Sequence, residues 1–289
     1  MKKFKKKIRK YLSKILPDSV KHLRRKILKL IDPSGGNTKI PPEELKMFEL
    51  LKDDMHVVFD VGARDDLSFY EIKNNCQYHL FEPDTESIVS LKNQIALLDN
   101  PDIVVNEFGL SDKKADNCVY YEESQSFAIN PFVKSIDTGK RYSLRTLDEY
   151  MTEHNVRHID FLKIDTEGLD YKIIMGGLET IKTKVSFIQF EYWDGVKKFT
   201  DVLGDNFNLY LMPGTRLIEA ILEDEIEYMT TSQKQKDYTK SIVPLDKDVT
   251  DLIDRILIPM GFGGNILGIS KKMNKNKIDV SKITFDVKR

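Results

Sequence analysis

From residue 41 to residue 193 the chain alternates between short apolar runs and segments whose apolar residues are spaced three or four apart. The runs are rich in β-branched and aromatic residues, which is typical of buried strands, whereas the spaced segments are typical of amphipathic helices. The predicted strands are residues 56–61, 77–83, 102–108, 159–165 and 185–193, and the predicted helices are residues 43–51, 85–98, 147–154 and 169–182. This alternation predicts an α/β fold with a mostly parallel sheet and helices on both faces.

Further strands are predicted outside this regular pattern. Residues 118–123 and 141–146 can pair as extra strands, and residues 207–212 and 265–271 look like a closing pair. Two helix starts carry capping residues: Asp84 is a plausible N-cap, and Thr146 with Glu149 forms a capping box. Residues 213–259 are long, charged and irregular until a helical pattern at 249–257, and we expect this insertion to cover a substrate site.

The first 31 residues form a basic arm on an acidic body. They contain thirteen Lys or Arg and one acid, whereas the remaining residues hold 32 bases and 45 acids, so the net charge of −1 hides a strong asymmetry. Apolar residues of the arm recur at helical spacing and basic residues fill the other face. Such a helix is typical of binding to an anionic membrane surface, at about 1 kcal/mol per basic residue. A helix docked on the body and a nucleic-acid-binding arm are the alternatives.

The chain is therefore divided into residues 1–37 as arm and linker, 38–271 as the folded domain and 272–289 as a basic tail. Two cysteines, Cys76 and Cys118, form no CxxC pair and suggest neither a disulfide framework nor a zinc site. No apolar run approaches the roughly 20 residues of a membrane span, and no secretory signal is visible. These features predict a cytoplasmic protein, with the arm as an expected peripheral membrane contact.

Four carboxylates fall at the ends of predicted strands: Asp60, Glu82, Asp165 and Glu191. In parallel sheets ligands bind at the carboxyl ends of the strands, so these acids are candidates for one site. A dinucleotide would require glycines at the positions held by Arg64 and Leu67, counting from Gly62, so that motif is absent. S-adenosylmethionine fits better, because Glu82 follows Asp60 by 22 residues, near the spacing of about 20 for a ribose-binding acid.

A set of short motifs resembles the FkbM family of S-adenosylmethionine-dependent methyltransferases. The matching segments are 59-FDVGA-63, 81-FEPD-84, 109-GLSD-112, 146-TLDEY-150 and 160-DFLKIDTEG-168. The resemblance implies a Rossmann-like class I fold with a mostly parallel seven-stranded sheet. It also implies O-methylation of a hydroxyl on a glycan, a glycolipid or a small metabolite.

The resemblance assigns cofactor-binding roles residue by residue. Gly62 and Ala63 would let the backbone approach the methionine portion, and Asp60 would hold its ammonium directly or through water. Glu82 would accept hydrogen bonds from the ribose hydroxyls. Phe108 and Gly109 would flank the adenine, with core packing as the other interpretation of Phe108.

The first motif departs from the family pattern at two positions. Arg64 stands where asparagine is usual, and Asp66 where the last glycine is usual. The side chain at position 66 is expected to crowd the cofactor and to repel its carboxylate, whereas Arg64 can pair with that carboxylate. A catalytically impaired, membrane-tethered binding module is therefore one alternative function.

Transfer to a hydroxyl needs a general base, or a metal that acidifies the hydroxyl. Asp165, Glu167 and Glu191 are the candidates for the base, and together they are also candidate ligands for Mg²⁺ or Ca²⁺. Tyr192 and Trp193 are candidates for an apolar platform under a sugar ring.

A nucleic-acid methyltransferase is the other alternative. The sequence lacks an Asn/Asp-Pro-Pro-Tyr/Phe motif after the fourth strand, and neither cysteine follows a proline. The acidic body argues against nucleic acid as a partner.

Overall fold

The computed structural model describes residues 42–99, 101–121, 137–212, 238–258, 263–273 and 284–287. The predicted basic arm, most of the predicted insertion and most of the basic tail lie outside these ranges. Within them, no helix combines the length and apolar character needed to cross a membrane.

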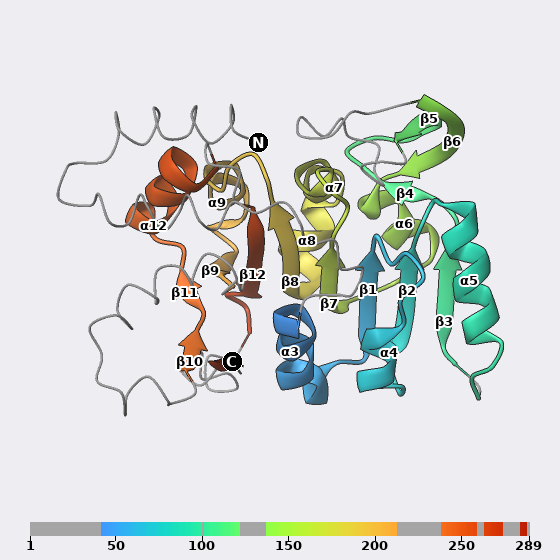
Figure 1. Cartoon of the computed structure of the whole chain (residues 1–289), viewed down its shortest axis with the longest axis horizontal. Coiled ribbons are helices and arrows are strands. Elements are labelled where there is room, and N and C mark those ends of the chain that lie inside the picture. Colours follow the sequence, from blue (N-terminus) through green and yellow to red (C-terminus); the bar gives the residue numbers. More distant parts are fainter. Residues whose placement is uncertain are drawn as a thin grey trace, which may run out of the picture.

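Eight strands of the described residues form the central sheet, in the order β11-β9-β12-β8-β7-β1-β2-β3 (Figure 1). Their bounds are Val57–Val61 for β1, Gln77–Phe81 for β2, Ile103–Asn106 for β3, Ile159–Ile164 for β7, Val185–Tyr192 for β8, Phe207–Leu211 for β9, Val243–Pro244 for β11 and Gly264–Ser270 for β12. The five strands from β8 to β3 pair in parallel. Strand β12 is antiparallel to both β8 and β9, which confirms the predicted closing pair.

The predicted number of seven strands is corrected. The short strand β11 pairs with β9 and adds an eighth member at that edge. The sheet is mostly parallel, as predicted, and the antiparallel pairs are those of β12 with β8 and β9 and of β11 with β9. Residues 243 and 244 lie in the segment predicted to be irregular, where the apolar run at residues 242–245 is short and is interrupted by Pro244, so hydrophobic patterning did not indicate this strand.

Helices cover both faces of the sheet and enclose two hydrophobic cores (Figure 1). One face packs against α3 (Pro42–Leu51), α4 (Ser68–Ile72) and α5 (Thr85–Ile95), and the other against α6 (Leu147–Glu153), α7 (Asp170–Gly176), α8 (Leu178–Lys184) and α9 (Lys197–Leu203). Side chains alternate between the faces along each strand: Val58 of β1 joins the first core, whereas Phe59 and Val61 join the second. This arrangement confirms the predicted α/β architecture.

The predicted helix over residues 169–182 is interrupted at Gly177. A Cβ at Gly176 would lie 2.0 Å from the backbone oxygen of Ser111, and one at Gly177 would lie 2.7 Å from Cδ2 of Leu147. The two glycines therefore permit close packing against neighbouring segments, and α8 begins after them. Both predicted caps are present, because Asp84 accepts a hydrogen bond from the Ser87 N–H and Thr146 accepts one from the Glu149 N–H.

A small three-stranded sheet lies beyond the carboxyl ends of the central strands (Figure 1). It contains β4 (Gly109–Leu110), β5 (Ala115–Tyr121) and β6 (Asp137–Arg145), and β5 pairs with β6 as predicted, in the antiparallel direction. A separate antiparallel pair joins β10 (Tyr238–Ser241) to β13 (Thr284–Val287), and neither strand was predicted. The helical pattern predicted at residues 249–257 corresponds to α12 (Lys247–Leu252), which begins two residues earlier, and a further helical segment, η3 (Ile253–Leu257).

Candidate active site

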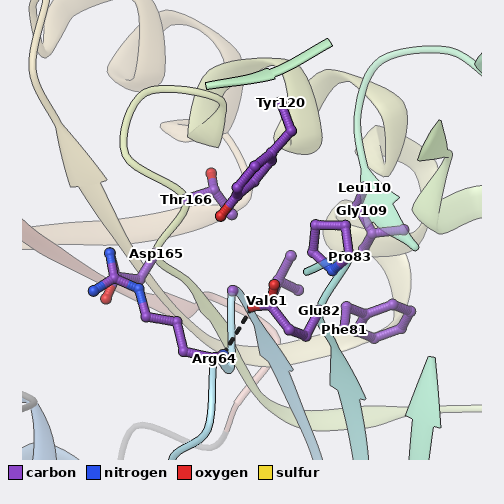
Figure 2. A pocket seen from close by; sticks show the side chains of 11 residues that line it. Val61, Arg64, Phe81, Glu82, Pro83, Gly109, Leu110, Tyr120, Asp165 and Thr166 are labelled. Atoms are coloured by element: carbon purple, nitrogen blue, oxygen red, sulfur yellow. Dashed lines mark hydrogen bonds between the residues drawn. The ribbon is translucent and has the colours of Figure 1, made fainter. Parts of the chain in front are cut away.

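A pocket lies at the carboxyl ends of β1, β2 and β7, the edge where ligands bind in open α/β sheets (Figure 2). Its lining includes Gly62 and Arg64 from the loop after β1, Glu82 after β2, Gly109 of β4 and Asp165 after β7. Two of the four strand-end acids predicted for one site, Glu82 and Asp165, thus line the same pocket.

Gly62 forms a sharp turn directly after β1, where the backbone passes close to the end of β7. Its φ of +85° is in the region that favours glycine, and a Cβ would lie only 2.0 Å from the backbone oxygen of Asp165. The Gly62 N–H donates to Phe81 O at 2.9 Å, and the Ala63 N–H donates to the same oxygen at 3.3 Å. Gly62 lines the pocket through its backbone, whereas Ala63 is buried in the core behind it.

Glu82 presents a buried carboxylate that two backbone groups hold in place. Its Oε2 accepts the Arg64 N–H at 2.9 Å, and its Oε1 accepts the Asp84 N–H at 2.7 Å. Burial raises the pKa of Glu82 to about 7, although these two hydrogen bonds act in the opposite direction. Each carboxylate oxygen has a second acceptor site, so the oriented group can also accept from a ligand.

Asp60 lies under the pocket, in an ion pair with a lysine. Lys163 Nζ is 3.4 Å from Asp60 Oδ1 and 3.3 Å from Asp165 Oδ2. Burial raises the pKa of Asp60, and the Lys163 ammonium acts against this shift. Asp60 thus pairs with an internal lysine and does not line the pocket, and its predicted hold on a ligand ammonium, directly or through water, stays a prediction.

Arg64 and Asp66, the two departures from the family motif, differ in their relation to the pocket, because Arg64 lines it and Asp66 does not. Arg64 has a left-handed φ of 52°, and its Nη2 lies 3.0 Å from Oε1 of Glu167, which shares the same unusual φ. The Asp66 carboxylate accepts the Ser68 N–H at 2.6 Å, at the start of α4. Asp66 does not line the pocket, so the expected crowding is not observed.

Phe108 and Gly109 separate into a core residue and a pocket residue. Gly109 lines the pocket. The Phe108 ring instead packs against the Phe81 ring, with 5.9 Å between the ring centroids, and the Arg145 Cζ lies 5.2 Å from the Phe108 centroid. The core interpretation of Phe108 therefore agrees with its position.

Tyr120 is a pocket residue that sequence reasoning missed. It extends from β5 across the pocket toward Thr166 and is 7% exposed (Figure 2). Its ring packs edge-on against the ring of Tyr142 on β6, with 5.4 Å between the ring centroids. The segment containing Tyr120 reads as a strand, but nothing in its local pattern indicates that this strand folds over the site.

Asp84 fixes the small sheet to the start of α5. Its Oδ1 accepts from Tyr142 Oη and from Lys140 Nζ, both at 3.1 Å. Burial alone would raise the pKa of Asp84, but the hydrogen bonds from Ser87, Lys140 and Tyr142 outweigh it and hold the pKa below its ordinary value. These two contacts position β6, and therefore also its partner strand β5, which carries Tyr120.

The three candidate catalytic acids occupy three different environments. Asp165 lines the pocket. The Glu167 carboxylate binds Arg64, and burial together with Asp165 raises the pKa of Glu167. The Glu191 carboxylate accepts the indole N–H of Trp193 at 2.8 Å. Across the described residues no group of three acids, histidines or cysteines is arranged to hold a metal ion.

A buried carboxylate, Asp170, connects the ends of β7 and β8. It accepts from the Thr166 hydroxyl at 3.0 Å and from the Glu191 N–H at 3.0 Å. Burial raises the pKa of Asp170 to about 7. Sequence analysis missed this residue because it occupies an ordinary first-turn position of a helix.

The strand order and the pocket at the carboxyl ends define a Rossmann-like α/β fold with a ligand site at the edge where such sheets bind ligands. More than half of the chain, residues 60–212, matches the methyltransferase FkbM domain. The chain belongs to this family of methyltransferases.

Among known proteins, the 2-O-methyltransferase NoeI of Sinorhizobium fredii is 25% identical over 173 residues, which cover 52% of this chain and 68% of that protein. The crystal structure of methyltransferase FkbM from Methylobacillus flagellatus KT is 14% identical, with a TM-score of 0.42. That match covers 72% of this chain and 55% of the other, so the chain spans little more than half of that protein's length. The O-methyltransferase TomG of Streptomyces achromogenes, solved with SAM, is 9% identical over 90% of this chain and 94% of its own, with a TM-score of 0.37.

Proposed function

We propose that this protein is an S-adenosylmethionine-dependent O-methyltransferase and that the pocket at β1, β2 and β7 binds the cofactor. The observation that carries the proposal is the buried Glu82 carboxylate, which the Arg64 and Asp84 N–H groups orient beside a turn that only glycine fits. A paired acceptor at the end of the second strand suits the two hydroxyls of a ribose. When bound, the cofactor supplies a methyl group on a sulfonium centre.

Several residues of the pocket then take defined binding roles. Glu82 accepts from the ribose hydroxyls, Gly62 lets the backbone approach the methionine portion, and Gly109 with Tyr120 borders the base. Arg64, which lines the pocket at the same loop, provides a cation for the methionine carboxylate. Asp60 acts indirectly, because it neutralises the lysine that contacts Asp165.

Asp165 is the acid we assign to accept the proton of the acceptor hydroxyl. Of the three candidates it is the one that lines the pocket, and its side chain is 25% exposed, so an acceptor can reach it. Lys163 holds Oδ2 at 3.3 Å and so limits the orientations of the carboxylate. Positioning of the nucleophile and removal of its proton are the main contributions that protein groups make to such a displacement.

The acceptor class we propose is a hydroxyl of a glycan, a glycolipid or a small metabolite. Support comes from the FkbM family and from a relative named as a 2-O-methyltransferase.

Calorimetric titration of the full chain with S-adenosylhomocysteine tests cofactor binding, with Glu82→Ala as the variant and Val89→Ala, on the exposed face of α5, as the control. We expect saturable heat for the wild type and for the control, and at least about tenfold weaker binding for Glu82→Ala, because two hydroxyl contacts to a charged group are lost. An intact-mass screen of glycans and glycolipids for the gain of one methyl group then identifies the acceptor. Absence of heat at millimolar ligand would overturn the proposal.

A further inference from the structure

The only tryptophan of the chain is exposed at the sheet edge that carries the pocket. Trp193 directly follows β8, whose neighbour β7 ends next to Asp165, and 39% of its surface is accessible. Among the exposed large hydrophobic side chains of the described residues, Trp193 is the one aromatic residue. A single exposed apolar side chain is ordinary on a protein surface, so the case for Trp193 depends on its place at the pocket edge of the sheet and on how its ring is held.

The indole of Trp193 is held in a fixed orientation. Its Nε1–H donates to Glu191 Oε2 at 2.8 Å. The ring also packs closely on Gly263, where a Cβ would lie 3.0 Å from Cε3 and 3.2 Å from Cδ2 of the indole. The hydrogen bond and the close backbone contact together restrict both the tilt and the rotation of the ring, which reduces the entropy cost of binding a ligand against it.

Hydrogen bonds connect this indole to the wall of the cofactor pocket. Thr166, which lines the pocket, donates to Asp170, and Asp170 also accepts the N–H of Glu191. Asp170 is only 2% exposed, so water does not compete for these hydrogen bonds. A ligand on Trp193 is therefore held at a defined position relative to the methyl-transfer site.

We propose that Trp193 and Glu191 form the acceptor subsite for a pyranose ring. The C–H face of a sugar packs on an exposed indole, while its hydroxyls need acceptors at the rim. Glu191 provides such an acceptor, because a carboxylate has about four lone-pair sites and can bind a sugar hydroxyl in addition to the indole N–H. This inference rests on the proposed function, since it names the class of acceptor whose hydroxyl is methylated.

Tyr192 takes no part in this subsite. It was predicted to share the platform, but it is 2% exposed and belongs to the core on the α6–α9 face of the sheet. The platform therefore consists of one ring, which fits a single sugar unit rather than an extended stacked surface.

Because the chain has a single tryptophan, its fluorescence reports directly on this subsite. We would titrate the full chain with methyl glycosides of the common hexoses, deoxyhexoses and pentoses, with benzyl alcohol as an apolar planar probe. Saturation-transfer NMR on the same glycosides would compare the wild type with Trp193→Ala and Glu191→Gln. Val89→Ala is the matched control, since Val89 is another exposed apolar residue and lies on α5, which packs beside β3 at the other end of the sheet.

We expect at least one glycoside to shift the tryptophan emission saturably, and its affinity to fall by about tenfold or more in Trp193→Ala but not in Val89→Ala. Glu191→Gln should weaken glycosides and leave benzyl alcohol unaffected. Binding of S-adenosylhomocysteine should be unchanged in all three variants, which separates this proposal from the cofactor proposal. If no glycoside moves the emission while the cofactor product binds normally, or if only benzyl alcohol does so, the sugar subsite is overturned and the proposed cofactor site stands.

Discussion

Lys163 and Asp60 form an ion pair in the interior of the protein, with Nζ 3.4 Å from Oδ1 and only 3% of either side chain exposed. The same ammonium lies 3.3 Å from Oδ2 of Asp165, which is 25% exposed at the pocket. The register of the strands explains the contact, because Asp60 of β1 lies opposite Lys163 of β7. Lys163 thus connects an acid of the core to an acid of the site.

Replacement of Lys163 by methionine should destabilise the protein strongly. It leaves the Asp60 carboxylate buried without a cation, and breaking a buried pair in this way costs about 3–5 kcal/mol. Urea denaturation of Lys163→Met measures the change in the free energy of unfolding. The double variant Asp60→Asn with Lys163→Met removes both charges of this pair and should lose markedly less stability than the single variant. Equal losses in the two proteins would show that the charge of Asp60 is not what the lysine compensates.

Gly62 should tolerate no side chain, for two reasons that experiment can separate. Its φ of +85° disfavours other residues, and a Cβ would also meet the backbone oxygen of Asp165 at 2.0 Å. Gly139 is the matched control, since it has the same φ but nothing within 4 Å of the added Cβ. Gly139→Ala should therefore cost about 1 kcal/mol for the backbone conformation alone.

Gly62→Ala should cost about 1–3 kcal/mol more than Gly139→Ala, because the turn must move away from β7. It should also abolish the binding of S-adenosylhomocysteine, which Gly139→Ala retains. Unfolding curves and calorimetry on both variants provide the comparison. Similar stability losses and retained binding in Gly62→Ala would mean that the loop relaxes without disturbing the site.

The sequence predicts the framework of this molecule better than its site. The strands of the parallel part of the sheet, and the helices that cover them, have regular apolar spacing in the sequence. The acids at the strand ends mark the edge of the sheet where the pocket lies. Glu82 and Asp165 were therefore found by position alone. Asp60 was predicted as a ligand contact from its position at the end of a strand. Its position in the sequence cannot show that Lys163 of β7 lies directly opposite Asp60 of β1.

Residues brought in by the small sheet and by helix starts were not predictable from local patterns. Tyr120 belongs to a strand whose fold over the pocket depends on contacts such as those of Asp84 with Lys140 and Tyr142. Asp66 was expected to crowd the site, but it binds the N–H of Ser68 instead. Each of these outcomes depends on long-range packing or on the rotation of one side chain, neither of which spacing in the sequence specifies.

Glu82 should make both stability and cofactor affinity depend on pH. Its pKa in the folded protein is about 7, against an ordinary value of 4.5, because burial disfavours the charged form. The folded state therefore holds this proton more tightly than the unfolded chain, and the corresponding stability is present below pH 4.5 and lost as the pH rises to about 7. The loss amounts to at most about 3 kcal/mol.

Comparison of the wild type with Glu82→Gln isolates this effect, since Asp170 titrates in both proteins. The free energy of unfolding of the variant minus that of the wild type should increase between pH 4.5 and pH 7 and then level off. Affinity of the wild type for S-adenosylhomocysteine should rise over the upper part of this range, because the ionised carboxylate can accept from both ribose hydroxyls. A difference in unfolding free energy that stays flat with pH would contradict the assignment of this titration to Glu82.

Asp165→Asn should separate catalysis from cofactor binding. If Asp165 accepts the proton of the acceptor hydroxyl, the amide cannot do so, and the rate of methyl transfer should fall by about 10²–10⁴. Affinity for S-adenosylhomocysteine should change only a few-fold, because Gly62 and Glu82 provide the main contacts. Glu167→Gln is the informative companion variant: its carboxylate is bound to Arg64, so it should reduce the rate less. Transfer to a verified acceptor at the wild-type rate by Asp165→Asn would remove Asp165 as the base, and a larger loss in Glu167→Gln would transfer that role to Glu167.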